Sequence, residues 1–145
     1  MRFCKIQFGS DEFRMECELR QDVLRAPLGL DLCMENLDAE KHQLHFGLFD
    51  DNGKLVACVI AVVISPTQVK IRQMAVASGK HGNGWGRKLL MNVESDIAAR
   101  GIQTVTLRAR KNVAGFYERL GYMRYGGTDF IEVGIPHVAM HKRLA

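Results

Sequence analysis

The sequence is poor in the features that mark several classes of protein. Its 145 residues include 3 prolines, 1 tryptophan and 4 cysteines, and no two cysteines form a CxxC pair. Such wide and irregular spacing argues against a zinc site and against a disulfide framework. We therefore expect no bound metal, and we expect the cysteines to be reduced apolar side chains.

Long hydrophobic runs and targeting signals are also missing. The longest apolar run, Leu55 to Ile64, covers ten residues and is too short to span a bilayer. The N-terminal stretch MRFCKIQF lacks the pattern of a cleavable signal peptide. We find no internal repeat and no low-complexity segment. The sequence thus predicts a single domain over residues 1–145 in a soluble, cytoplasmic protein that does not bind membranes.

Charge is modest overall but unevenly distributed. The net charge at pH 7 is +4, and it divides into −4 for residues 1–65 and +7 for residues 66–115. A localised basic segment suits a polyanionic ligand. Nucleic acid is one such ligand, and a pI near 9.0 is compatible with it. However, the chain has no zinc-finger spacing, no RRM signature and no arginine-rich arm, so we expect no nucleic-acid partner.

Residue periodicity predicts an α/β protein. A first helix is expected from Asp11, after an N-cap at Ser10, to about Arg25, and a short one around residues 31–37. Two more are expected, one from about Gly84 to Arg100 and a short one that begins at Asn112. Strands are expected over residues 3–8, 44–49, 55–64, 69–76, 105–107, 122–125 and 138–141. Three of these strands follow one another across an Asn-Gly turn and Pro66, which predicts a mixed, mostly antiparallel central sheet flanked by helices.

The segment GKHGNGWGRKLL, residues 79–90, combines four glycines with basic side chains and no acidic residue. A helix begins directly after the glycines, and the free N–H groups of its first turn form an anion site together with the helix dipole. The glycines Gly82, Gly84 and Gly86 follow a GxGxG pattern, which fits neither a P-loop nor a Rossmann fingerprint. Taken alone, the segment could also be an ordinary glycine turn.

Two segments together resemble the GNAT superfamily of N-acetyltransferases. RQMAVASGKHGNGWGRKLL is similar to the acetyl-CoA motif of that family, a strand followed by Gln/Arg-x-x-Gly-x-Gly/Ala and a helix, which maps onto His81, Gly84 and Gly86. VTLRARKNVAGFYERLGY, residues 105–122, is similar to the second family signature. LRQDVLRAPLGL and FIEVGIPHVAMHKRL also resemble a bacterial branch of small GNAT proteins near the ElaA-like group. The histidine at position 81 departs from the usual Gln or Arg.

The resemblance implies the GNAT fold and an acetyl-CoA-dependent N-acetyltransferase. The acetyl group would pass from acetyl-CoA to a primary amine of a small molecule or peptide by direct attack in a ternary complex. Dimers are common in the family, so a homodimer is implied as well. The residues implied to contact acetyl-CoA lie on the strand before the loop, in the loop and in the second signature: Met74, Ala75, Val76, His81, Gly82, Asn83, Gly84, Trp85, Gly86, Arg87, Asn112 and Phe116. The Val76 N–H is the candidate donor to the oxyanion.

The same resemblance suggests the acid and base. Tyr117 matches the general acid of the family; a phenol with a pKa of ~10 can protonate a leaving thiolate. Glu132 and His137 are candidate bases, because both are isolated ionisable groups in FIEVGIPH, a segment that is unusually apolar for a surface loop. The alternatives are a core role for Tyr117, a solvated Glu132 and a structural His137.

Glu35 and Asp38 are weaker candidates for the base, from an acidic segment whose charge would favour a cationic acceptor. A different function is also open at this point: a catalytically silent module that senses acyl-CoA would need the same binding motif.

Overall fold

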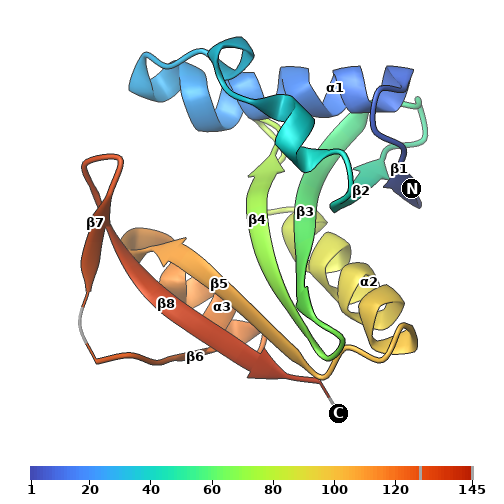
Figure 1. Ribbon diagram of the computed structural model, residues 1–145. Helices are drawn as coiled ribbons and strands as arrows, with labels where there is room; N and C mark the ends of the chain where they lie inside the picture. The colour runs from blue at the N-terminus through green and yellow to red at the C-terminus, as the bar shows by residue number, and fades with distance from the viewer. Residues whose placement is uncertain (128, 145) are drawn as a thin grey trace.

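A twisted mixed sheet runs through the computed structural model, which describes residues 1–127 and 129–144 (Figure 1). The strand order is β1-β2-β3-β4-β5-β8-β6, and β7 pairs with β8. The only parallel neighbours among the described strands are β4 and β5. The strands are β1 (Arg2–Ile6), β2 (Leu44–Phe49), β3 (Leu55–Ser65), β4 (Gln68–Val76), β5 (Thr104–Arg110), β6 (Met123–Arg124), β7 (Phe130–Glu132) and β8 (Ile135–Arg143). The predicted α/β class and mostly antiparallel sheet are confirmed.

Helices cover both faces of the sheet. Helix α1 (Asp11–Arg20) packs on one face, while α2 (Trp85–Ala99) and α3 (Ala114–Arg119) lie behind the sheet in Figure 1. The buried apolar residues accordingly form two clusters. The α2-side core contains Phe46, Val59, Val69, Ile71, Leu89, Val93, Ile97, Val105, Leu107 and Met140. The α1-side core contains Ile6, Phe13, Leu19, Phe49, Cys58 and Ala75.

The segment between α1 and β2 is irregular. The helix predicted to reach Arg25 does so, but its last turn, Gln21–Arg25, is a π-helix. The short helix predicted around residues 31–37 is replaced by 3-10 turns at Leu32–Met34 and Leu37–Glu40, after another at Ala26–Leu28. These turns bury only Leu32 and Glu40, so no apolar stripe supports a regular helix there.

The sequence predicts no strand within FIEVGIPH, residues 130–137, but the structure has strands there. Strands β7 and β8 form a hairpin across Val133 and Gly134, whose φ angles of 46° and 75° are those of a tight primed turn. Asn-Gly is the usual signal for such a turn, and Val-Gly does not carry it. Among the described residues, no helix is both long and apolar enough to cross a membrane.

Candidate active site

The parallel strands β4 and β5 separate halfway along their length. They pair only from Gln68 opposite Thr104 to Ile71 opposite Leu107. Beyond this point β4 continues beside β3, and β5 continues beside β8 as far as Arg110. Figure 1 shows the two strands diverging. The sheet is therefore open between the second half of β4 and the end of β5, which we call the splay.

A β-bulge marks the start of the splay. The register between β3 and β4 shifts by one residue between the pairs Ile60–Arg72 and Cys58–Ala75. Gln73 lies in the bulge with a φ of 55°, which is rare for a residue other than glycine. The bulge reverses which positions of the strand face each side of the sheet. Before it, the odd-numbered Ile71 faces the α2-side core; after it, the even-numbered Met74 faces that core and Ala75 faces the α1-side core.

The bulge also decides which backbone groups of β4 face the opening. The Ala77 N–H donates to the Val56 carbonyl, so the pair of Ala57 and Val76 is not hydrogen-bonded. The N–H and C=O of Val76, and by alternation those of Met74, therefore point away from β3 and toward the splay. Those of Ala75 point toward β3. Of the three residues predicted to contact acetyl-CoA on this strand, Met74 and Val76 offer open backbone groups.

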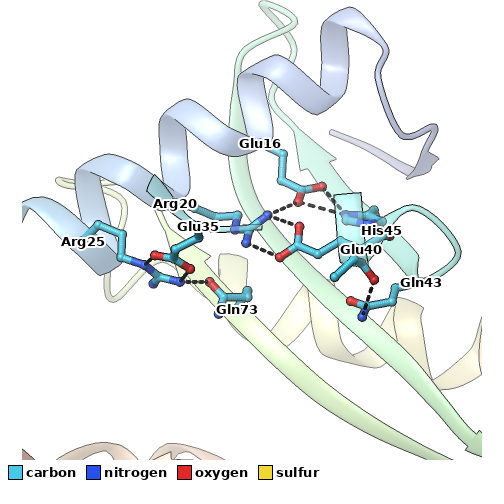
Figure 2. A network of polar contacts seen from close by, with 9 residues as sticks. Glu16, Arg20, Arg25, Glu35, Glu40, Gln43, His45 and Gln73 are labelled. Atoms are coloured by element: carbon cyan, nitrogen blue, oxygen red, sulfur yellow. Dashed lines mark hydrogen bonds and ion pairs between the residues drawn. The ribbon is translucent and has the colours of Figure 1, made fainter. Parts of the chain in front are cut away.

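Arg25 links the irregular segment after α1 to the bulge (Figure 2). Its Nη2 lies 3.0 Å from Gln73 Oε1. The same guanidinium donates two hydrogen bonds to the Glu35 carboxylate, with Nε 2.5 Å from Oε2 and Nη2 3.0 Å from Oε1. The hydrogen bond from Arg25 lowers the pKa of the Glu35 carboxyl. Glu35 is thus bound as an anion, which makes it a poor general base.

The glycine-rich loop leads into α2 at the open end of β4. Gly79, Gly82 and Gly84 have φ angles of 81°, 83° and 77°, which side chains other than glycine rarely adopt. Gly84 is the N-cap residue and no side chain caps the helix. The first hydrogen bond within the helix runs from the Lys88 N–H to the Gly84 carbonyl. The N–H groups of residues 85–87 come before it and so have no partner within the helix. With no acidic residue in the first turn, this helix start can bind an anion.

The two sequence signatures meet at Gly86. A Cβ atom added there would lie 3.2 Å from both Met74 Cε and Phe116 Cζ. A glycine therefore allows α2, β4 and α3 to approach one another closely. Trp85 packs against the α2-side core, and the Lys88 ammonium lies 5.4 Å from its ring centroid. Asn112 is exposed in the turn before α3.

Tyr117 lies beside the strand just after the bulge. Its hydroxyl donates to Met74 Sδ at 3.5 Å. Its ring packs edge-on against Phe116 and Tyr122, with centroids 5.0 and 5.8 Å away. Burial raises the pKa of Tyr117 to about 12. The side chain is therefore a neutral phenol at physiological pH, so it can donate a proton.

The structure brings Glu132 and His137 together on the β7–β8 hairpin. The imidazole is 6% exposed, and its Nδ1 lies 2.7 Å from the Ile135 carbonyl oxygen. Since a carbonyl only accepts, Nδ1 carries a proton and Nε2 is left to accept one. Nε2 lies 3.6 Å from Glu132 Oε2, and Arg108 Nη1 lies 2.8 Å from Glu132 Oε1. Val138 and Met140 face the α2-side core, so His137 faces the opposite side of the sheet.

A buried ionic cluster under α1 was missed by the sequence analysis. Arg20 donates to Glu16 at 3.0 Å and to both oxygens of Glu40 at 2.8 and 2.7 Å (Figure 2). His45 Nδ1 lies 2.9 Å from Glu16 Oε2, and Nε2 lies 2.9 Å from the Glu40 carbonyl oxygen. Only Glu16 and Arg20, four residues apart on a helix, gave a sequence signal.

The residues of this cluster fit a group of ion pairs that holds the fold together better than they fit a metal site. Oxygen and nitrogen atoms of Glu16, Glu40 and His45 lie within 4.8 Å of one another, a set that could ligate a metal ion. However, the guanidinium of Arg20 donates to both carboxylates and supplies the positive charge that a metal would supply. The cluster therefore anchors α1 to β2 and to the turn before it.

Comparison with known proteins identifies the family. The family profile described as the acetyltransferase (GNAT) domain matches residues 31–144. The chain belongs to the GNAT family. It is an acetyl-CoA-dependent N-acetyltransferase, as the two sequence signatures predicted. The match includes the splay, the glycine-rich loop and the second signature.

Individual GNAT relatives cover nearly the whole chain. The Bacillus subtilis (strain 168) protein named uncharacterized N-acetyltransferase YitI is 28% identical over 134 residues, which are 88% of this chain and 89% of the relative. The structure of Escherichia coli ElaA has a TM-score of 0.80 at 19% identity and covers 98% of this chain and 99% of its own.

An aminoglycoside 6'-N-acetyltransferase complexed with coenzyme A has a TM-score of 0.81 at 17% identity, with 99% of this chain and 97% of the other covered. At these identities the two structures confirm the GNAT fold.

Proposed function

We propose that the chain, as one N-acetyltransferase domain, transfers the acetyl group of acetyl-CoA directly to a primary amine in a ternary complex. The observation that carries this proposal is the splay between β4 and β5. It combines open backbone groups on Met74 and Val76, an anion-binding helix start at one end and a protonated Tyr117 alongside. The four free cysteines suit a reducing compartment, so the proposed location is the cytoplasm.

The helix start and the splay fit the two ends of acetyl-CoA. The N–H groups of residues 84–87 would bind the pyrophosphate, with Lys80, Arg87 and Lys88 adding positive charge. The ring of His81 can offer an N–H to the same phosphates, in place of the usual Gln or Arg. The open backbone groups of Met74 and Val76 would pair with the amides of the pantetheine arm, as a neighbouring strand does. Asn112 and Phe116 border this path from the side of α3.

The reaction forms one C–N bond and breaks one C–S bond. The amine attacks the thioester carbonyl, whose oxygen becomes an oxyanion, and the thiolate leaves. Tyr117 donates its proton to that thiolate. The reacting carbon must therefore lie close to the Tyr117 hydroxyl, which contacts Met74. This proximity favours the Met74 N–H over the Val76 N–H as the oxyanion donor.

The amine must lose a proton to attack. His137 offers a free Nε2 on the face opposite α2, and imidazoles accept protons near neutral pH more readily than carboxylates do. Glu132 is held by Arg108 and lies close to the same nitrogen. We propose His137 as the base and Glu132 as the group that stabilises the imidazolium. In this arrangement the base and Tyr117 approach the splay from opposite faces of the sheet.

Release of free thiol from acetyl-CoA over a panel of amines tests the function. A Tyr117→Phe variant should lose about tenfold or more in kcat, because the leaving thiolate loses its proton donor. Its affinity for acetyl-CoA should be nearly unchanged, because the proposed contacts to the pyrophosphate and the pantetheine arm come from the start of α2 and from the backbone of β4. An unchanged kcat would exclude Tyr117 as the acid. Tight binding of acetyl-CoA without thiol release for any amine would instead indicate a silent acyl-CoA sensor.

A further inference from the structure

Four cationic side chains share one face of the sheet beside the splay. Lys70 and Arg72 lie on β4, and Arg108 and Arg110 lie on β5. Their neighbours in each strand, such as Ile71 and Leu107, face the α2-side core, so the four cations face the other way. We call them the basic face. In Figure 1 this side of the sheet is turned toward the viewer, with α3 behind β5 and β8.

Two carboxylates act on the basic face, Glu132 and Glu35. The pKa of Glu35 is lowered chiefly by Arg25 and also by the charge of Arg72. Arg108 pairs with Glu132 at 2.8 Å. Within residues 1–127 and 129–144, Lys70, Arg72 and Arg110 form no ion pair. Burial lowers the pKa of Lys70, and the positive charges of Arg108 and Arg72 lower it further.

Three carboxylates near α1 are paired with arginines. The negative count of the acidic segment had favoured a cationic acceptor, whereas the basic face favours an acceptor that carries an anionic group. Glu16 and Glu40 are buried on Arg20, and Glu35 is bound by Arg25. Glu16 and Glu40 are neutralised in the interior, and the partly exposed Glu35 is neutralised by Arg25, so these three carboxylates contribute little attraction at the splay.

A cavity lies on the basic face over the last paired residues of β4 and β5, next to the splay. It has a volume of about 320 Å³ and is lined by Lys70, Thr106, Arg108, Tyr125 and Phe130, among others. Lys70 and Thr106 are opposite each other, one residue before the last parallel pair. A cavity of this size that combines aromatic and cationic side chains suits a small molecule with an anionic group.

The amine acceptor must reach the thioester from this face. The opposite face is covered by α2 and α3 and carries the proposed phosphate site. His137 and Glu132 also lie on the open side. The cavity, the cations and the proposed base therefore all lie on the same face of the sheet, the face from which an acceptor would approach the splay.

We propose that the acceptor is a small amine that also carries a carboxylate, as an α-amino acid does. This inference rests on the proposed acetyl transfer. Lys70, which lines the cavity, and Arg72, two residues further along β4 on the same face, bind the carboxylate, and the amine is thereby directed toward the splay. The same cations disfavour the ammonium form of the acceptor, because like charges lower its pKa. The basic face thus selects an acceptor that carries a carboxylate. It also increases the fraction of the acceptor that is present as the neutral, nucleophilic amine.

Matched amines test this selection by thiol release from acetyl-CoA. Each set contains an α-amino acid, its amide and the corresponding decarboxylated amine. The kcat/KM of the amino acid should be about tenfold or more above those of its amide and of the decarboxylated amine, because one charge-assisted hydrogen bond contributes a factor of this size. An equal or higher kcat/KM for the decarboxylated amine across the sets would overturn the inference.

Two variants show whether the basic face is responsible. Arg72→Gln and Lys70→Gln should each raise KM for the amino acid about tenfold and reduce the preference over the amide. KM for acetyl-CoA should stay unchanged. Lys54→Gln is the matched control, since Lys54 is exposed in the turn between β2 and β3. Variants that keep the full preference for the carboxylate would contradict the proposal.

Binding separates this inference from the proposed reaction. The amino acid and its amide are titrated by calorimetry into the protein saturated with CoA. Carboxylate-dependent binding that is lost in Arg72→Gln supports the inference even if no amine releases thiol, an outcome that would refute acetyl transfer alone. Equal binding of the amino acid and the amide would refute the inference alone.

Discussion

The hydroxyl of Tyr117 donates to the sulfur of Met74 at 3.5 Å. This contact joins the second sequence signature to the strand that follows the bulge, although the two residues are 43 positions apart. It places a neutral phenol beside the open backbone edge of β4. The proposed acid and the proposed oxyanion donor thus occupy neighbouring positions before any ligand binds.

Gly86 should be sensitive to the addition of a single methyl group. Gly86→Ala brings a Cβ within 3.2 Å of Met74 Cε and Phe116 Cζ, so both side chains must move at the proposed pantetheine path. We expect weaker binding of acetyl-CoA by calorimetry. Gly115→Ala is the matched control, because a Cβ there meets only the end of the Arg119 side chain at 3.5 Å. The control should bind acetyl-CoA normally and gain up to about 1 kcal/mol of stability from helix propensity. Equal affinities of the two variants would contradict the close approach at Gly86.

Arg20 should be essential to stability. Arg20→Met leaves the buried carboxylates of Glu16 and Glu40 without their shared partner. Breaking a buried ion pair in this way costs about 3–5 kcal/mol in the free energy of unfolding, which urea denaturation measures. The matched control is Arg14→Met on the same helix, where the pair with Glu18 is exposed and is worth about 0.5 kcal/mol. A loss of similar size in both variants would show that the buried cluster is not important.

His45 should make stability depend on pH. Burial opposes the charged imidazole, but the hydrogen bond and negative charge of Glu16 outweigh it, with help from Glu40, and raise the pKa of His45. Because this pKa is higher in the folded state, the stabilisation is complete below the unfolded pKa of about 6.5. It is lost as pH rises through the folded pKa.

Urea unfolding between pH 6 and pH 8 measures this effect. The free energy of unfolding should decrease with rising pH over part of that range, and His45→Gln should flatten the decrease. The range stays below the region where the thiols of Cys17 and Cys58, whose pKa values are raised by burial, would add a decrease of their own. A wild-type profile identical to that of His45→Gln would contradict the assignment.

Local patterns account for the parts of the site that could be predicted. Gly79, Gly82 and Gly84 lie in a continuous loop whose conformation depends mainly on the glycines themselves, and Gly86 follows in the first turn of α2. The second signature likewise places Phe116 and Tyr117 on one short helix. Both segments show their chemistry within a few residues, so the anion site and the candidate acid could be proposed from the sequence.

Long-range packing accounts for the parts that could not. The bulge holds Gln73 at a positive φ that no local pattern indicates, next to Arg25, 48 positions away in the chain. The charge count of the N-terminal segment could not show that Glu16 and Glu40 lie in the interior, paired with Arg20. A sequence lists charges, but only the fold decides which of them reach the surface.

A crystal structure of the complex with CoA tests the central claim most directly. The account predicts that the pyrophosphate contacts the N–H groups of residues 84–87 and that the pantetheine arm pairs with Met74 and Val76 in the splay. The CoA sulfur should then lie within hydrogen-bonding distance of the Tyr117 hydroxyl. A CoA bound outside the splay, or a sulfur far from Tyr117, would contradict the account.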